Sequence, residues 1–227
     1  IRVAGGDFQE GSTLLEAGIP LTAGAIAVAA MAGYGDLQVG GRPDVSILAS
    51  GDELCAPGEY CDAAHIPSSN SPMLAAMLAN LPCNVSDCGI VEDKMEALEK
   101  AIQNCLRSDI IVTTGGASVG DHDLVEPVLR KMGARIDFWK VAIRPGKPLI
   151  VGRIGETIIL GLPGNPSSAY VTATLFLLPL VRYLAGSNAP LPKAIDGTLG
   201  QPLAAGGNRT EFLRAFEENG FISPFSK

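Results

Sequence analysis

The chain has 227 residues, of which 47% are hydrophobic and 18% charged, and 24 acidic against 17 basic residues give a formal net charge of −7. This much apolar material can bury a core, so the composition excludes a disordered chain. The acidic balance argues against a general nucleic-acid binder, because phosphate contacts need clustered lysine and arginine. A local basic pocket for a small anion stays open.

The N-terminal stretch, residues 1–43, differs from the rest of the chain. Thr22 is suited to cap a short helix over residues 23–31, and Gly33 is suited to end it. The run of two glycines, arginine and proline at residues 40–43 predicts a hinge. We therefore expect a boundary near residue 43.

From residue 44 onward, the pattern predicts strands that alternate with helices. Apolar and β-branched runs predict strands over 45–49, 85–91, 110–113, 136–143, 149–152 and 157–160. Apolar side chains at helical spacing predict helices over 72–81, 95–106 and 124–132, the first of them capped by Ser71. This alternation is typical of a three-layer α/β protein, with a mostly parallel sheet and helices on both faces.

The last helix of this region is long and apolar. Asn165 caps it, Pro166 occupies its first turn, and it runs to about residue 184 with a bend near Pro179. The uncharged stretch 157–181, which includes most of this helix, is interrupted at residues 163–168 by two prolines, a glycine and polar residues, so it does not supply an unbroken bilayer span. We expect a soluble, cytoplasmic protein that does not bind a membrane.

The five cysteines are an odd number, and their spacing matches no CxxC metal clip. The sequence has only two histidines, which gives no Cys–His zinc pattern. We interpret the cysteines as free thiols in a reducing compartment.

The first of three loops that could carry chemistry is the glycine-rich run 113–123. Its glycines let the backbone approach an anion, and its hydroxyls can help to hold a phosphate. Asp121 and Asp123 could hold a magnesium ion beside that phosphate. The alternative is a tight turn with solvated acids. The predicted binding residues of this loop are Thr114, Gly115, Gly116, Ser118 and Gly120.

The second loop places three cations, Lys140, Arg144 and Lys147, within eight residues of a chain that is otherwise poor in charge. Such a loop could bind an oxyanion or a phosphate. The alternative is a solvated hairpin turn.

The third loop, residues 161–168, opens the long helix, so unpaired backbone N–H groups face it. Gly164, Asn165 and Ser168 are its predicted binding residues. The alternative is ordinary helix capping.

All three loops follow or join predicted strands, and in such sheets ligands bind beyond the carboxyl ends of the strands. The pairs Asp52–Glu53 and Glu92–Asp93 add carboxylates after two further strands. Cations beside several carboxylates suit a phosphorylated substrate with a bound divalent metal.

Together, these motifs resemble one family. TTGGASVGDHD at 113–123, FWKVAIRPGKP at 138–148 and GLPGNPSS at 161–168 are similar, in this order and spacing, to the molybdopterin molybdotransferases, which include the E domain of gephyrin. SGDEL at 50–54, Ser-Ser-Asn at 68–70 and GIVED at 89–93 extend the resemblance over essentially the whole chain.

The resemblance implies a domain organisation. Residues 44–186 match the family's Rossmann-like, three-layer molybdopterin-binding module. Residues 1–43 resemble part of an elongated β-rich domain, and residues 187–227 resemble the start of a C-terminal β-barrel. Other family segments have no counterpart here, so we expect a fragment of a longer protein.

The reaction implied by the resemblance transfers molybdenum from molybdate onto the dithiolene sulfurs of adenylated molybdopterin and releases AMP, in a step that needs Mg²⁺. Asp123 and Glu53 match metal-linked acids, and Asp93 matches a further functional acid. Lys140 and Lys147 would steady molybdate or pyrophosphate. Ser118 would contact the phosphate or pterin, and Ser168 the molybdate pocket.

Two departures and two alternatives accompany this resemblance. Arg144 stands where many members have lysine, and Pro67–Ser68 replaces a more usual aromatic–Asp pair. The alternatives are a molybdopterin adenylyltransferase that uses ATP, and a non-catalytic scaffold of the gephyrin type. The flanking pieces 1–43 and 187–227 favour the molybdotransferase, since a stand-alone adenylyltransferase lacks them. The resemblance also implies a homodimer, with a molybdopterin adenylyltransferase as a further partner.

Overall fold

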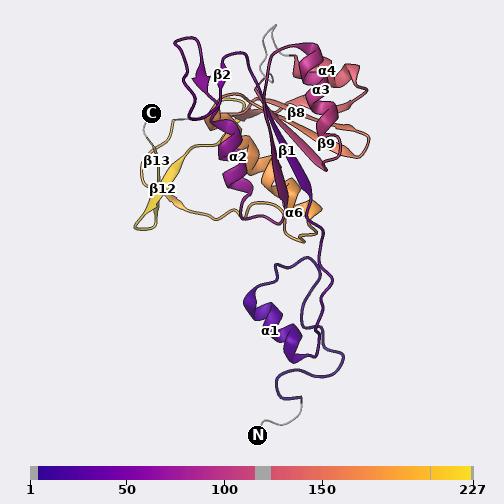
Figure 1. Cartoon of the computed structure of the whole chain (residues 1–227). Helices are drawn as coiled ribbons and strands as arrows, with labels where there is room; N and C mark the ends of the chain where they lie inside the picture. The colour runs from indigo at the N-terminus through magenta and orange to yellow at the C-terminus, as the bar shows by residue number, and fades with distance from the viewer. Residues whose placement is uncertain (1–4, 116–123, 205, 226–227) are drawn as a thin grey trace.

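The structure is a computed structural model, and it describes residues 5–115, 124–204 and 206–225. Figure 1 shows an α/β body built around one sheet, with the segment that carries helix α1 (Ala23–Met31) extending away from it. Thr22 caps α1 as predicted, because its hydroxyl accepts a hydrogen bond of 3.2 Å from the Ala25 amide.

The body is built on a six-stranded sheet in the order β4-β1-β5-β9-β8-β6. Its first four strands are parallel, whereas β8 is antiparallel to β9 and β6 is antiparallel to β8. The sheet is thus mainly parallel, as predicted, and its antiparallel part comes from two short connections. The strands are β1 (Asp44–Ser50), β4 (Asn84–Val91), β5 (Ile110–Thr114), β6 (Arg135–Lys140), β8 (Pro148–Ile154) and β9 (Thr157–Leu162).

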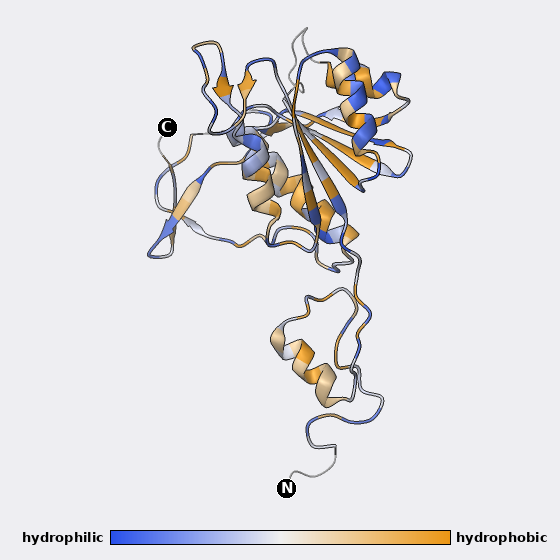
Figure 2. Ribbon diagram, viewed as in Figure 1, coloured by the Kyte–Doolittle hydropathy of each residue, from blue (hydrophilic) through white to orange (hydrophobic). Residues whose placement is uncertain are grey.

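Helices cover both faces of this sheet, which confirms the three-layer prediction. Helix α2 (Asn70–Leu78) and the long helix that starts at Pro166 pack on one face, where Ile47 and Val112 are fully buried. Helices α3 (Met95–Cys105) and α4 (Val125–Lys131) pack on the other face. Figure 2 shows the apolar residues concentrated along the strands and on the helix faces turned toward them.

The start of α2 differs from the prediction. The helix begins at Asn70, with Ser69 at the N-cap position and Ser71 inside the first turn, and it ends at Leu78 rather than at residue 81. Apolar periodicity starts only at Met73, so it could not show that the preceding polar residues already belong to the helix. The Leu81 amide bonds to the Leu78 carbonyl in a turn that closes the helix.

The long helix is irregular where a bend was predicted. Helix α5 (Pro166–Thr172) passes through a π-helical turn, η1 (Ala173–Leu177), into α6 (Leu178–Leu184). Pro179 has no N–H to donate, and its ring would clash with the carbonyl of Leu175 in a regular helix, which accounts for the wider turn before it.

Among the described residues, Pro166–Leu184 is the one helical stretch long and apolar enough to cross a membrane. A core helix meets the same criteria, so this is weak evidence for a span. Ala169, Ala173, Leu177 and Val181 recur every four residues along it and are buried, the last three in the apolar cluster on this face of the sheet.

The segments on either side of the body carry little regular structure. Residues 5–43 contain α1 and, within that described range, no strand. Near the other end, β10 (Thr198–Leu199), β13 (Phe221–Pro224) and β12 (Ala215–Glu218) form a small sheet. The two segments meet where the Asn188 amide bonds to the Gly18 carbonyl at 3.0 Å. The division at residues 43 and 186 stays a prediction.

One prediction about the cysteines is wrong. Cys55 and Cys61 are joined by a disulfide in the structure, with their Cα atoms 6.1 Å apart, whereas free thiols were expected. Cys55 ends the short strand β2 (Leu54–Cys55), which pairs with β3 (Ile66–Pro67), and the chain turns back between the two cysteines. The hydrogen bond from the Glu59 amide to the Ala56 carbonyl marks this turn, which spacing alone did not indicate.

Candidate functional site

The sheet topology brings the predicted loops to one edge. β1, β4, β5 and β9 are parallel, so the loops after residues 50, 91, 114 and 162 leave the sheet at the same side. Because β8 runs opposite to β9 and β6 opposite to β8, the basic loop between Lys140 and Pro148 opens at that side as well. Loops up to about a hundred residues apart in the chain thus lie at one edge of the sheet, the edge at which such sheets bind ligands.

A pocket of about 520 Å³ lies at this edge, within the size range of small-molecule sites. Residues from the ends of three of the four parallel strands, β1, β5 and β9, and from the start of α2 line it. Six of the sequence-predicted site residues are among them: Glu53, Thr114, Gly115, Gly164, Asn165 and Ser168.

Gly115 lets two loops approach each other in this pocket. Its φ is +89°, and a Cβ there would lie 2.0 Å from the carbonyl oxygen of Ser50. Any other side chain would therefore push the end of β5 away from the end of β1. The third loop is in ordinary van der Waals contact, since a Cβ on Gly164 would be 3.5 Å from the Gly115 Cα.

Asn70 ties two of these loops together. Its side-chain amide donates to the Thr114 hydroxyl at 2.6 Å and to the Gly164 carbonyl at 2.7 Å. The residue is 8% exposed, and its Oδ1 has no hydrogen-bond partner among the described residues. Asn70 is not among the site residues predicted from the sequence. The polar Ser-Ser-Asn run at 68–70, just before the apolar residues of the helix, is the pattern that could have indicated it.

The acidic residues at this edge divide into two groups. The Ser50 hydroxyl donates to the Asp93 carboxylate, and the Asp93 amide donates to the Asp52 carboxylate at 2.9 Å. Asp93 therefore joins the loops after β1 and β4, and it is not among the residues that line the pocket. Glu53 is exposed and does line it.

The basic loop lies beside the pocket rather than in its lining. Gly146 has a φ of +102°, and a Cβ there would lie 2.5 Å from Cγ2 of Thr172, so glycine allows the loop to pack on α5. The Lys140 ammonium sits 4.9 Å from the ring centre of Trp139. Lys147 is exposed.

The third cation of this loop is paired. Arg144 lies on β7 (Ile143–Arg144), which pairs with β11 (Thr210–Glu211), and its guanidinium is 3.1 Å from the Glu211 carboxylate. The C-terminal segment is thereby held against the basic loop.

The start of α5 shows what Asn165 does. Its Oδ1 accepts a hydrogen bond of 3.2 Å from the Ser168 amide, which is the helix cap predicted from the sequence. Asn165 and Ser168 also line the pocket, so this polar turn faces any bound ligand.

Five predicted residues of the glycine-rich loop, Gly116, Ser118, Gly120, Asp121 and Asp123, lie outside the described residues. Within residues 5–115, 124–204 and 206–225, no group of three His, Cys, Asp or Glu side chains could hold a metal ion. Glu53 is the carboxylate that the pocket itself offers to a hard cation.

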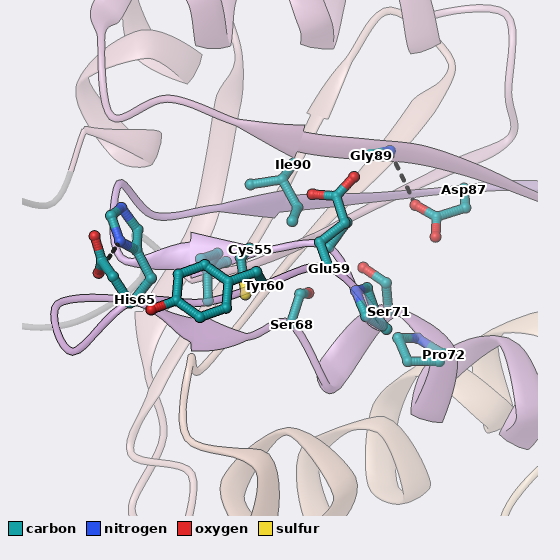
Figure 3. Close-up of a pocket in the computed structure, with 14 residues that line it drawn as sticks. Cys55, Glu59, Tyr60, His65, Ser68, Ser71, Pro72, Asp87, Gly89 and Ile90 are labelled. Atoms are coloured by element: carbon teal, nitrogen blue, oxygen red, sulfur yellow. Dashed lines mark hydrogen bonds and ion pairs between the residues drawn. The ribbon is translucent and has the colours of Figure 1, made fainter.

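A second hollow of about 670 Å³ adjoins the first and shares Leu54 and Ser68 with it. Figure 3 shows Tyr60 and His65, from the turn between β2 and β3, on one side of it, and Asp87 and Gly89 of β4 on the other. His65 bonds to Asp62 at 2.6 Å, and this bond lowers the pKa of the Asp62 carboxyl.

The amino-acid sequence is similar to those of known proteins. The model of the family described as "Probable molybdopterin binding domain" matches residues 46–183. A molybdopterin molybdenumtransferase of Haemophilus influenzae is 34% identical over 220 residues, which are 95% of this chain and 54% of that protein. The enzyme of the same name from Staphylococcus aureus strain COL is 33% identical over 219 residues, which are 95% of this chain and 52% of that protein. The chain spans about half the length of these relatives.

Solved structures agree on the fold. The molybdopterin biosynthesis MoeA protein of Pyrococcus horikoshii superposes with a TM-score of 0.80 at 25% identity, covering 97% of this chain and 55% of that one. A molybdenum cofactor biosynthesis protein of Pyrococcus furiosus superposes with a TM-score of 0.69 at 22% identity, covering 98% of this chain and 70% of that one.

Proposed function

The chain belongs to the molybdopterin-binding domain family that its residues 46–183 match, and from this premise we propose that it acts in molybdenum cofactor biosynthesis as a molybdopterin molybdenumtransferase. In this reaction, molybdenum from molybdate is placed on the dithiolene of adenylated molybdopterin, and AMP is released. The observation that carries the proposal is the pocket at the sheet edge. There the ends of β1, β5 and β9 meet, and the Asn70 side chain is hydrogen-bonded to both Thr114 and Gly164.

In this proposal, the pocket binds the phosphate end of the substrate. The Thr114 oxygen accepts from Asn70, so its own O–H is free to donate to an anionic oxygen. The Ser168 hydroxyl offers a second donor at the pocket wall. Lys140 and Lys147, exposed beside the pocket, would attract molybdate and the phosphate groups through charge.

The proposed cofactor is Mg²⁺, held by Glu53 and Asp123. Glu53 fits the role because its carboxylate lines the pocket and is exposed, whereas Asp93 is engaged with Ser50. The ion would neutralise charge on the phosphate oxygens while the phosphate bond to AMP is broken. Replacing Glu53 by glutamine should then weaken the dependence of AMP binding on Mg²⁺.

We also propose a cytoplasmic homodimer that works beside a molybdopterin adenylyltransferase. Helix α1 and the turn after it leave Ile26 52%, Met31 63% and Tyr34 64% exposed. Monomers rarely leave such a group of large apolar side chains uncovered, and a second subunit would cover it.

The test measures binding and turnover separately. Calorimetry with AMP and with molybdate should show binding to the chain, weakened several-fold by Lys147→Ala. Incubation of the chain with adenylated molybdopterin, molybdate and Mg²⁺ should release AMP only when all three are present. Asp123→Asn should abolish that release while the circular dichroism spectrum is unchanged.

Two results would overturn the proposal. Formation of pyrophosphate from ATP and molybdopterin would assign the chain to adenylyl transfer instead. An absence of both AMP binding and molybdate binding, in a folded chain, would leave a non-catalytic scaffold as the better description.

A further inference from the structure

Two cysteines that do not line the pocket at the sheet edge lie sulfur to sulfur. The Sγ atoms of Cys88 and Cys105 are 3.0 Å apart. Cys88 belongs to β4, one of the two edge strands of the sheet, and Cys105 is the last residue of α3, which packs on that strand. Since a disulfide bond is about 2.05 Å long, a movement of about 1 Å would bring these sulfurs to bonding distance.

A β-bulge gives Cys88 the freedom to make that movement. The register between β1 and β4 shifts after Ile47, so that Cys88 and Gly89 together oppose the single residue Leu48. Gly89 has a φ of +81°, and its amide donates to the Asp87 carboxylate at 2.9 Å. Bulged residues are released from regular pairing, and the bulge turns the side chain away from the strict alternation of the strand.

The two thiols have different surroundings. Cys88 is exposed, whereas Cys105 is only 6% exposed and belongs to the apolar cluster between α3 and the sheet. Burial raises the pKa of the Cys105 thiol to about 12. A small oxidant in solution therefore reaches Cys88 first, while Cys105 waits as a neutral thiol next to it.

We propose that Cys88 and Cys105 form an oxidation site, at which a hydroperoxide converts the two thiols into a disulfide that links β4 to α3. The thiolate of Cys88 attacks the peroxide, the O–O bond breaks, and Cys88 becomes a sulfenic acid while water or an alcohol leaves. The Cys105 sulfur then attacks the Cys88 sulfur, the S–O bond breaks, and hydroxide leaves and takes up the Cys105 proton as water. The two thiols lose two electrons, which reduce the peroxide.

The link would stabilise an edge of the sheet. It closes a loop between residues 17 apart and so restricts the unfolded chain. For a chain of this size, the expected rise in melting temperature is about 5–10 °C, reversed by a dithiol reductant.

The experiment maps the bond in the whole chain. The reduced protein is treated with hydrogen peroxide, the remaining thiols are alkylated, and the chain is digested with trypsin and a glutamyl/aspartyl protease. These cuts isolate Cys88 in the peptide 88–92 and Cys105 in the peptide 101–107. The expected product is these two peptides joined by a disulfide, together with the rise in melting temperature.

Three variants decide the result. Cys88→Ser and Cys105→Ser should each lose the linked peptide and the temperature rise, while Cys83→Ser should keep both. Because Cys88→Ser retains Cys55 and Cys61, it also removes their oxidation as an explanation of the rise. The proposal is overturned if peptide 101–107 stays unlinked while Cys88 is oxidised further, or if the rise persists in Cys88→Ser.

Discussion

The side-chain amide of Asn70 donates a 2.6 Å hydrogen bond to the hydroxyl of Thr114, which lies 44 residues further along the chain. A second hydrogen bond from the same nitrogen, 2.7 Å long, reaches the Gly164 carbonyl. One buried amide thus joins the first turn of α2 to the loops after β5 and β9. A side chain in this position controls how far apart the two walls of the pocket stand.

Replacing Asn70 by alanine should therefore loosen the pocket. The change leaves the Gly164 carbonyl without this donor in a partly buried place, which costs about 1–3 kcal/mol of unfolding free energy. AMP affinity, measured by calorimetry, should fall together with the urea midpoint. The matched control is Asn84→Ala, since the Asn84 amide makes one exposed bond of 2.8 Å to Asp44 and should cost less than about 0.5 kcal/mol. Equal losses of AMP affinity and of urea midpoint in both variants would contradict this role of Asn70.

Replacing Gly115 by alanine tests the close approach of the loops. Both Gly115, at φ +89°, and Gly133, at φ +80°, have a backbone that disfavours alanine, by about 1–2 kcal/mol. At Gly133 nothing lies within 4 Å of the new Cβ, whereas at Gly115 it meets the Ser50 carbonyl at 2.0 Å. Gly133→Ala should lower only stability, and Gly115→Ala should lower stability further and abolish AMP binding. Retained AMP binding in Gly115→Ala would show that the loops can separate without harm.

The sequence predicts the layers of this fold well because they depend on local patterns. Apolar periodicity marked β1, β5 and α3 within a residue or two, and a proline marked the irregular turn before Pro179. The convergence of the loops also followed, because parallel strands end at one edge whatever their order.

Contacts that depend on how the chain folds back on itself could not be predicted in the same way. The hydrogen bonds of Asn70 and the disulfide between Cys55 and Cys61 depend on where the chain turns back, which residue types alone do not state. The pairing of Arg144 with Glu211 likewise needs the register of β7 and β11. The sequence predicted which residues carry chemistry, and the structure shows which of the described ones already have hydrogen-bond or ion-pair partners.

The ion pair of Arg144 leads to a prediction about its role. The pair is solvent-exposed, so Glu211→Gln should change the unfolding free energy by less than about 1 kcal/mol. If Arg144 helps to hold the anionic substrate, this variant frees the guanidinium, and molybdate affinity measured at low salt should stay equal or rise. Arg144→Ala should lower that affinity. Parallel losses in the two variants would instead mean that Arg144 acts only by holding β11.

The buried thiol of Cys105 makes stability depend on pH at the alkaline end. Burial, reinforced by the hydrogen bond between the Cys105 and Cys88 thiols, raises the pKa of Cys105 from 9.0 to about 12, so the folded chain holds this proton more tightly than the unfolded chain does. The resulting stabilisation is complete below about pH 9, where both states are protonated, and is lost as the pH rises toward 12. Under reducing conditions, urea unfolding at about pH 8 and about pH 10 should therefore show a larger fall for the native chain than for Cys105→Ala. Cys83→Ala is the control for a thiol that is only partly buried, and it should retain most of the native pH dependence. An identical fall in the native chain and in Cys105→Ala would mean that water reaches Cys105, and the distinction between an exposed and a buried thiol at this site would no longer hold.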